Sequence, residues 1–297
     1  MATVTTFAKA QNLLGESPFW NQDRLSVFWV EIEKGILHEK KLHQEEQWSW
    51  DIGQKISVIL SFKNDEVLLG SLDGIIKFHL ITEKITFVQP LETGISTQRC
   101  NDGAFDVYGN IWIGTMDLEV KKGLGSLYRI SEQGLVNKMI DHLSIPNGLV
   151  FSLDNMRMYF IDTPSKSVKS YLLDLSGNIS FEKISIVIPE NMGMPDGMAI
   201  DQEGMLWIAL YAGAAVIRCN PVTGEIINKI TLPALNITNC CFAGANLEEL
   251  IVTSAGENMT EEELNNYPSS GNVFRLNDLK VKGIKTLSHK PSTTFFQ

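Results

Sequence analysis

The stretch M-P-D-G-M-A-I-D-Q-E-G-M-L-W-I-A-L, residues 194–210, contains the repeating unit that decides the fold. Residues 197–200 form a short apolar run, residues 201–204 an Asp-x-x-Gly turn, and residues 205–210 a second apolar run. Because Asp and Gly favour a tight reversal between two β-prone segments, this stretch predicts a β-hairpin.

The same pattern recurs five more times along the chain. An aromatic residue precedes a polar turn and an apolar strand in residues 19–31, 62–72, 105–115, 151–163 and 242–254. The six units begin at residues 19, 62, 105, 151, 200 and 242, so successive starts are 43, 43, 46, 49 and 42 residues apart. One four-stranded propeller blade takes roughly 40–50 residues. The spacing predicts an all-β fold, a six-bladed β-propeller with four-stranded blades around a central channel.

The even spacing also favours a single domain over residues 1–297, since closed all-β folds often reach this size in one piece. The sixth unit lacks one strand, and the β-prone segment 2–8 at the other end of the chain is unassigned. We expect the N-terminal strand to pair with the last blade, because ring closure hides exposed sheet edges. Residues 284–297 lie beyond the six blades and are expected to form a loose tail.

The composition limits the possible partners. A net charge of −10 argues against binding to nucleic acid or to an anionic membrane, since both would be repelled. No apolar run approaches the roughly 20 residues of a membrane span, and the start M-A-T-V-T-T lacks the apolar core of a signal peptide. We therefore expect a cytoplasmic protein that is a monomer or a weak homo-oligomer.

Equivalent positions of the repeat predict a polar cluster in the channel. The first strand of each propeller blade lines the axis, so matching residues of different blades face one another. The positions four residues before Trp20, Phe62, Phe105, Phe151, Ile200 and Phe242 are Glu16, Val58, Asn101, Asn147, Asp196 and Thr238. Buried carboxylates and carboxamides are costly unless a cation or hydrogen bonds satisfy them. One divalent cation would do so, and oxygen ligands favour Ca²⁺, Mg²⁺ or Mn²⁺ over Zn²⁺. Alternatively, these Asn-Gly and Asp-Gly pairs only form turns.

Other residues have two interpretations each. Arg99 either caps a loop through an ion pair or reaches the channel mouth, where it can bind a ligand's oxygens. The loop 117–125 is longer than a tight hairpin, and it either covers a site or is an ordinary surface loop. Trp112 and Trp207 are expected in the core, and Asp106 and Asp201 are expected to accept hydrogen bonds from their own turns.

Five motifs give the chain a resemblance to a known family. They are G-E-S-P-F-W (residues 15–20), R-C-N-D-G (99–103), G-T-M (114–116), P-N-G-L (146–149) and P-D-G-M-A-I-D (195–201). Together they resemble the regucalcin, gluconolactonase and luciferin-regenerating enzyme family over nearly the whole chain. The resemblance implies a six-bladed propeller with one catalytic divalent metal at Glu16, Asn147 and Asp196. It also implies that Arg99 and Asn101 hold substrate and that Glu119 contributes. The D-L-E-V that follows G-T-M here departs from the family pattern.

Three functions are compatible with these features. The first is a metal-dependent hydrolase of sugar-acid lactones, a small-molecule substrate, in which Asp196 takes a proton from the attacking water. The second is a non-catalytic, calcium-binding or regulatory propeller. The third is hydrolysis of another lactone, an ester or a phosphotriester on the same scaffold. A polar ring inside the channel favours an enzyme, because a propeller that only binds partners needs a recognisable rim instead.

Overall fold

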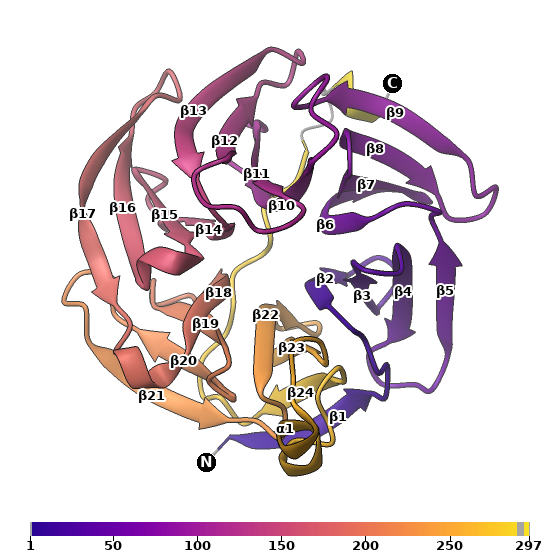
Figure 1. Cartoon of the computed structure of the whole chain (residues 1–297), viewed down its shortest axis with the longest axis vertical. Helices are drawn as coiled ribbons and strands as arrows, with labels where there is room; N and C mark the ends of the chain where they lie inside the picture. Colours follow the sequence, from indigo (N-terminus) through magenta and orange to yellow (C-terminus); the bar gives the residue numbers. More distant parts are fainter. Residues whose placement is uncertain (1, 290–293, 297) are drawn as a thin grey trace.

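The computed structural model describes residues 2–289 and 294–296. These residues form six antiparallel sheets of four strands each, arranged as a ring (Figure 1). The six-bladed β-propeller predicted from the repeat is therefore confirmed. In each of the first five blades the strands follow one another from the centre of the ring to its rim.

The strand bounds follow the repeat closely. Blade one contains β2 (Gly15–Asn21), β3 (Ser26–Glu31), β4 (Ile36–Lys41) and β5 (Gln47–Asp51). Blade two contains β6 (Ile56–Lys63), β7 (Glu66–Ser71), β8 (Gly74–His79) and β9 (Ile85–Pro90). Blade three contains β10 (Gln98–Phe105), β11 (Ile111–Asp117), β12 (Gly125–Ile130) and β13 (Val136–Leu143). Blade four contains β14 (Pro146–Phe151), β15 (Arg157–Asp162), β16 (Ser167–Leu173) and β17 (Ile179–Val187). Blade five contains β18 (Met194–Ile200), β19 (Leu206–Tyr211), β20 (Ala215–Cys219) and β21 (Ile226–Thr231).

The sixth blade combines the two ends of the sequence. It contains β22 (Asn236–Ala243), β23 (Glu249–Ala255) and β24 (Val273–Asn277), with β1 (Thr3–Ala8) as its outermost strand. Strand β1 pairs antiparallel with β24 from Thr3 opposite Asn277 to Ala8 opposite Val273. The edge of β24 is thus covered by the N-terminal segment, and blade six is held to the start of the chain.

The hairpin turns attach to the core through their aspartates. Asp201 accepts hydrogen bonds from the backbone of Glu203 and Met205 through one oxygen, and from the Trp207 indole through the other, at 3.0 Å. Asp106 and Trp112 repeat this arrangement in blade three, with an oxygen–indole distance of 2.9 Å. Both indoles are buried. In blades three and five, one aspartate thus both forms the turn and binds the core tryptophan.

Hydrophobic clusters hold neighbouring blades together. The described residues form six large clusters, and each one joins side chains of two adjacent blades. For example, one cluster packs Phe28 of blade one against Leu69 of blade two, and another packs Phe7 of β1 against Trp29 of blade one. Because burial of apolar surface drives this packing, the blades are held at fixed positions around the axis.

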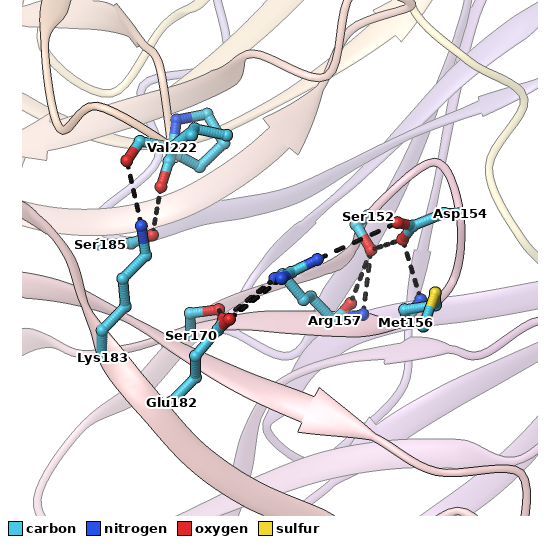
Figure 2. A network of polar contacts seen from close by, with 10 residues as sticks. Ser152, Asp154, Met156, Arg157, Ser170, Glu182, Lys183, Ser185 and Val222 are labelled. Atoms are coloured by element: carbon cyan, nitrogen blue, oxygen red, sulfur yellow. Dashed lines mark hydrogen bonds and ion pairs between the residues drawn. The ribbon is translucent and has the colours of Figure 1, made fainter.

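Polar contacts add to these clusters in blade four and at its boundary with blade five (Figure 2). Within blade four, Arg157 on β15 forms an ion pair with Glu182 on β17 at 3.0 Å. Lys183 then donates a hydrogen bond to the carbonyl of Val222 in a turn of blade five, at 3.0 Å. Such partly exposed ion pairs contribute little to stability, about 0–1 kcal/mol each. We assign this network to the outer surface and not to a functional site.

The expected loose tail instead packs on the ring. In Figure 1 the C-terminal segment crosses the ring near its centre. Residues 290–293 and 297 of this segment lie outside the described residues, but the short helix η3 (Thr294–Phe296) buries Phe295 and Phe296 in the cluster between blades two and three. His289 also lies within hydrogen-bond distance, 2.7 Å, of the Ser61 hydroxyl. The two apolar rings give the segment a buried anchor that the strand pattern did not reveal.

Outside the sheets, the insertion in blade six contains the helix α1 (Glu261–Asn266). Thr260 caps it, since its hydroxyl accepts the Glu263 amide and the Glu263 carboxylate accepts the Thr260 amide. This capping box stabilises the start of the helix formed by the acidic run. None of the helices in the described part of the chain is long and apolar enough to cross a bilayer.

Candidate active site

Four of the predicted ring residues lie on innermost strands and are buried. Glu16 is on β2, Asn101 on β10, Asn147 on β14 and Asp196 on β18. Their side chains are 6–9 % exposed. Val58 of blade two is also buried but is apolar, so that blade supplies no polar group at the matching position. The structure thus collects oxygen-bearing side chains from four separate blades.

β-Bulges in the innermost strands lie next to several of these side chains and set their direction. The register of the innermost strand shifts between Glu16 and Phe19 in blade one, and between Asn147 and Leu149 in blade four. In blade five it shifts after Pro195, next to Asp196. A β-bulge turns a strand locally and re-aims the residues beside it, and bulges are common next to active sites. The innermost strands of blades one, four and five therefore share a bulge as well as a similar sequence.

The bulge changes one assignment. The sequence pattern put Thr238 at the ring position of blade six, but β22 shifts register between Ile237 and Asn239. Thr238 consequently turns away and contacts the carbonyl of Gly15 and the Thr253 hydroxyl. Asn239 takes its place, and its amide donates a hydrogen bond to the Glu16 carboxylate at 3.0 Å. Counting four residues back from Phe242 gives Thr238 and not Asn239. Thr238 is the extra residue of the bulge, so the side chain that faces the ring is one position later than the count predicts.

Asn101 and Asn147 are joined in a hydrogen-bond chain. The Asn101 amide donates to Asn147 Oδ1 at 2.8 Å, and the Asn147 amide donates to the Thr163 hydroxyl at 2.8 Å. Thr163, in the short helix η1 (Thr163–Ser165), donates in turn to the carbonyl of Pro195 at 2.8 Å. Since the Asn147 NH₂ group is held by Thr163, its carbonyl oxygen is directed toward Asn101. The sequence reading did not identify Thr163, which looks like an ordinary turn residue before a proline.

The two carboxyl groups of the ring have strongly perturbed acidity. Burial, and next the charge of Asp102, raise the pKa of Glu16 to about 8. Burial, and next the charge of Glu16, raise the pKa of Asp196 well above its usual value. No described residue donates a hydrogen bond to the Asp196 carboxylate. Placing two buried carboxylates within each other's field is unfavourable unless positive charge is supplied.

Asp102 adds a third carboxyl group that the sequence reading missed. It follows Asn101 in R-C-N-D-G, and one of its oxygens accepts the Gly103 amide at 2.8 Å. Burial raises its pKa to about 6. Asp-Gly pairs are common in turns, so the sequence motif did not show that Asp102 belongs to the site.

Arg99 lies beside the ring without a carboxylate partner among the described residues. It is 8 % exposed. One guanidinium nitrogen donates to the Cys100 carbonyl at 2.8 Å and to the Asn101 carboxamide oxygen at 2.6 Å. An arginine has five N–H donors, so several remain available to a ligand. Of the two interpretations of Arg99, the structure favours contact with the site over an ion pair that caps a loop.

Glu119 is not brought to the ring. Its side chain is 75 % exposed, and it pairs with Lys121 at 2.6 Å in the loop between β11 and β12. The Asp117 carboxylate holds this loop by accepting the backbone amides of Glu119 and Lys121. The D-L-E-V sequence therefore gives a loop that turns this glutamate to solvent, and the contribution implied by family resemblance has no counterpart in the geometry.

The donor set fits a hard divalent cation. Glu16, Asn147 and Asp196 offer carboxylate and carboxamide oxygens, the ligands that Ca²⁺, Mg²⁺ and Mn²⁺ prefer. The described residues contain no group of three or more His, Cys, Asp and Glu side chains placed to hold a metal. The buried, mutually repelling carboxylates are the structural feature that a cation would stabilise.

An apolar cavity of about 150 Å³ lies at the opposite ends of the innermost strands. Its walls include Phe105, Phe151 and Phe242 together with Leu287 of the C-terminal segment. Asp102 and Asn239 also line the cavity, which therefore adjoins the polar ring, but most of its other walls have no group capable of acid–base chemistry or metal binding. The candidate site is therefore the polar ring and not this cavity.

Comparison with known proteins identifies the family of the chain. Residues 14–256 match the family model described as SMP-30/Gluconolactonase/LRE-like region. The chain is 35% identical to regucalcin of Gallus gallus, with 91% of this chain and 93% of that protein covered. It is 32% identical to YvrE of Bacillus subtilis, provisionally named a sugar lactone lactonase, with coverage of 90% and 92%.

A solved structure gives the same result in three dimensions. It is a calcium-binding protein, regucalcin, from Agrobacterium tumefaciens. Its TM-score is 0.90 at 28% sequence identity, and the match covers 96% of each chain. The backbone similarity therefore extends over nearly the whole propeller.

Proposed function

Because the chain belongs to the SMP-30/gluconolactonase/LRE-like family, we propose that it is a divalent-metal-dependent hydrolase that opens sugar-acid lactones to aldonic acids. The observation that carries the proposal is the pair of buried carboxyl groups, Glu16 and Asp196, beside the oriented carboxamide of Asn147. A site built only for stability would avoid this arrangement, since buried charges without partners are costly. The lactonase name of the Bacillus relative supports the choice of substrate class.

In this proposal the ring residues have different roles in metal binding and proton transfer. Glu16, Asn147 and Asp196 would hold the cation, which when bound would polarise the lactone carbonyl and stabilise negative charge on its oxygen. Asp196 has an oxygen free of protein hydrogen bonds and would take a proton from the attacking water. As the ring carbon–oxygen bond breaks, the same proton would pass to the departing oxygen and give the hydroxy acid.

Arg99 and Asn101 would orient the substrate. The guanidinium has unused donors beside the ring, and the Asn101 carboxamide is fixed by contacts with both Arg99 and Asn147. Fixed donors around the substrate lower the entropic cost of reaching the reactive geometry. A protein that only binds calcium has no need for this additional buried cation, so Arg99 favours an enzyme over the regulatory alternative.

The proposal is tested by measuring whether one added metal restores hydrolysis to the metal-free protein. Protein freed of metal with a chelator would be reloaded separately with Ca²⁺, Mg²⁺, Mn²⁺ or Zn²⁺ and assayed on D-glucono-1,5-lactone, phenyl acetate and a phosphotriester. The proposal expects metal-dependent hydrolysis with a preference for the sugar lactone. Arg99→Ala should raise KM or lower kcat while metal affinity stays within a few fold. Tight calcium binding with no hydrolysis of any substrate would instead support a regulatory propeller.

A further inference from the structure

Glu257 is a carboxylate at the metal-site end of the ring that the mechanism above does not use. It is the second residue after β23, in the blade-six insertion, and its backbone is fixed from two directions. Its amide donates to the carbonyl of Leu13 at 3.0 Å, and its carbonyl accepts the side-chain amide of Asn236 at 2.9 Å. The position of the residue is therefore set by blades one and six, independently of its own side chain.

The charges around Glu257 agree with a position near the candidate site. Burial and the charge of Glu33 raise its pKa, whereas the charge of Arg99 lowers it. In return, the charge of Glu257 contributes to the raised pKa of Asp196. The geometric support is the backbone, whose contacts with Leu13 and Asn236 put Glu257 beside the starts of β2 and β22, the end of the innermost strands where Glu16 and Asp196 lie.

The other charged groups at this mouth are already engaged. Glu31 accepts the backbone amides of Leu13 and Leu14. Glu33 forms an ion pair with Lys55. Within the described part of the chain, the Glu257 carboxylate has neither a hydrogen bond nor an ion pair of its own. Glu257 and Arg99 are thus the two charges here with unused capacity for a ligand.

A hydroxyl group lies in the same region. Tyr211 ends β19, and its backbone is opposite Met194 at the start of the strand that carries Asp196. Its phenol oxygen accepts the side-chain amide of Asn258, the residue after Glu257, at 3.2 Å. The phenol proton stays available, so this wall offers an acceptor at Glu257 and a donor at Tyr211.

We propose that Glu257 is a specificity-determining residue that accepts hydrogen bonds from the hydroxyl groups of a neutral sugar lactone and disfavours lactones that carry an acidic group. This inference rests on the proposed function. A bound divalent cation would balance Glu16 and Asp196, Lys55 balances Glu33 and Arg99 balances Glu257, so no positive charge is left over for an acidic substrate. Polyhydroxylated neutral molecules offer the donors and acceptors that both groups require. An added carboxylate on the substrate would lie in the field of Glu257.

The test compares two neutral lactones of the same ring size and one acidic lactone. Glu257→Gln keeps the size of the side chain and removes its charge, and Glu261→Gln, in the exposed helix α1 of the same insertion, is the matched control. For Glu257→Gln we expect the KM for D-glucono-1,5-lactone to rise roughly tenfold, because charge-assisted hydrogen bonds to hydroxyls are lost. The KM for δ-valerolactone, which has no hydroxyl groups, should change less than about twofold. Activity on the acidic D-glucaro-1,4-lactone, relative to the gluconolactone, should increase.

Equal effects on the two neutral lactones, or no effect on either, would overturn the inference. A parent protein that hydrolyses no lactone would refute the proposed function but would leave recognition testable by binding. D-glucitol, the sugar alcohol with the matching hydroxyl groups, would then be titrated calorimetrically into metal-loaded parent and Glu257→Gln. Roughly tenfold weaker binding by the variant supports the role of Glu257. Equal affinity, or no binding to the parent, refutes it.

Discussion

The hydroxyl of Thr163 should control the metal site through Asn147. Thr163→Val keeps the shape of the side chain and creates no cavity, but it removes the acceptor for the Asn147 amide and the donor to the Pro195 carbonyl, both at 2.8 Å. Thr163 is buried, so water cannot replace these bonds freely. Each such hydrogen bond contributes about 0.5–1.5 kcal/mol, which predicts a loss of roughly 1–3 kcal/mol in the free energy of unfolding.

The effect on metal affinity follows from orientation. Without Thr163 the Asn147 carboxamide can rotate, although the Asn101 amide still holds its oxygen at 2.8 Å. Loss of a group that orients a ligand typically weakens metal binding about 10–100-fold. We therefore expect calorimetric titration of Ca²⁺ or Mn²⁺ into metal-free Thr163→Val to give a Kd raised by about that factor, with binding retained. Thr163→Ser keeps the hydroxyl and should stay near the parent value. A folded Thr163→Val that binds metal as tightly as the parent would refute this account of Asn147.

Three further predictions concern parts of the chain outside the ring. Glu119→Ala should leave kcat and KM for the sugar lactone unchanged, since the side chain is exposed and paired with Lys121; a tenfold loss would show that the loop closes over substrate. Burial lowers the pKa of His38 from 6.5 to about 4, so the unfolded state binds its proton first on acidification and stability falls from pH 6.5 toward pH 4. In His38→Phe, urea unfolding across this range should lack that decline, up to roughly 3 kcal/mol, and an unchanged pH profile would contradict the assignment. Removal of residues 2–8 strips β1 from β24 and should lower the melting temperature and promote aggregation, whereas a stable monomer would show that blade six needs only three strands.

The fold was predictable because one local pattern is repeated. A polar turn between two apolar runs gives a similar hairpin in each blade, and in blades three and five the turn aspartates Asp106 and Asp201 accept hydrogen bonds from matching tryptophans. Adding the repeats gives the number of blades, and counting within them gives Glu16, Asn147 and Asp196. These features depend on local spacing, which the sequence displays directly.

The remaining features depend on contacts between distant segments. Asn239 and not Thr238 faces the ring, because a bulge shifts the register of β22. The amino-acid types at this point do not predict a bulge. Thr163 and Glu257 come from connections between strands, whose paths are set by packing and not by the repeat. The C-terminal segment was expected to be loose, since its anchors, Phe295 and Phe296, do not follow a strand pattern.

The central claim is that Asp196 both holds a cation and takes the proton of the attacking water. Lactone hydrolysis by Asp196→Asn, measured with metal occupancy confirmed by titration, tests it most directly. The asparagine keeps an oxygen ligand but loses the charge and the basic lone pair. We predict that excess metal fills the site while kcat stays about 10²–10⁴-fold below the parent, and that Glu16→Gln recovers most of its activity under the same conditions. Parent-like hydrolysis by fully loaded Asp196→Asn would contradict the assignment of the base, and parent-like hydrolysis by the metal-free parent would contradict the account as a whole.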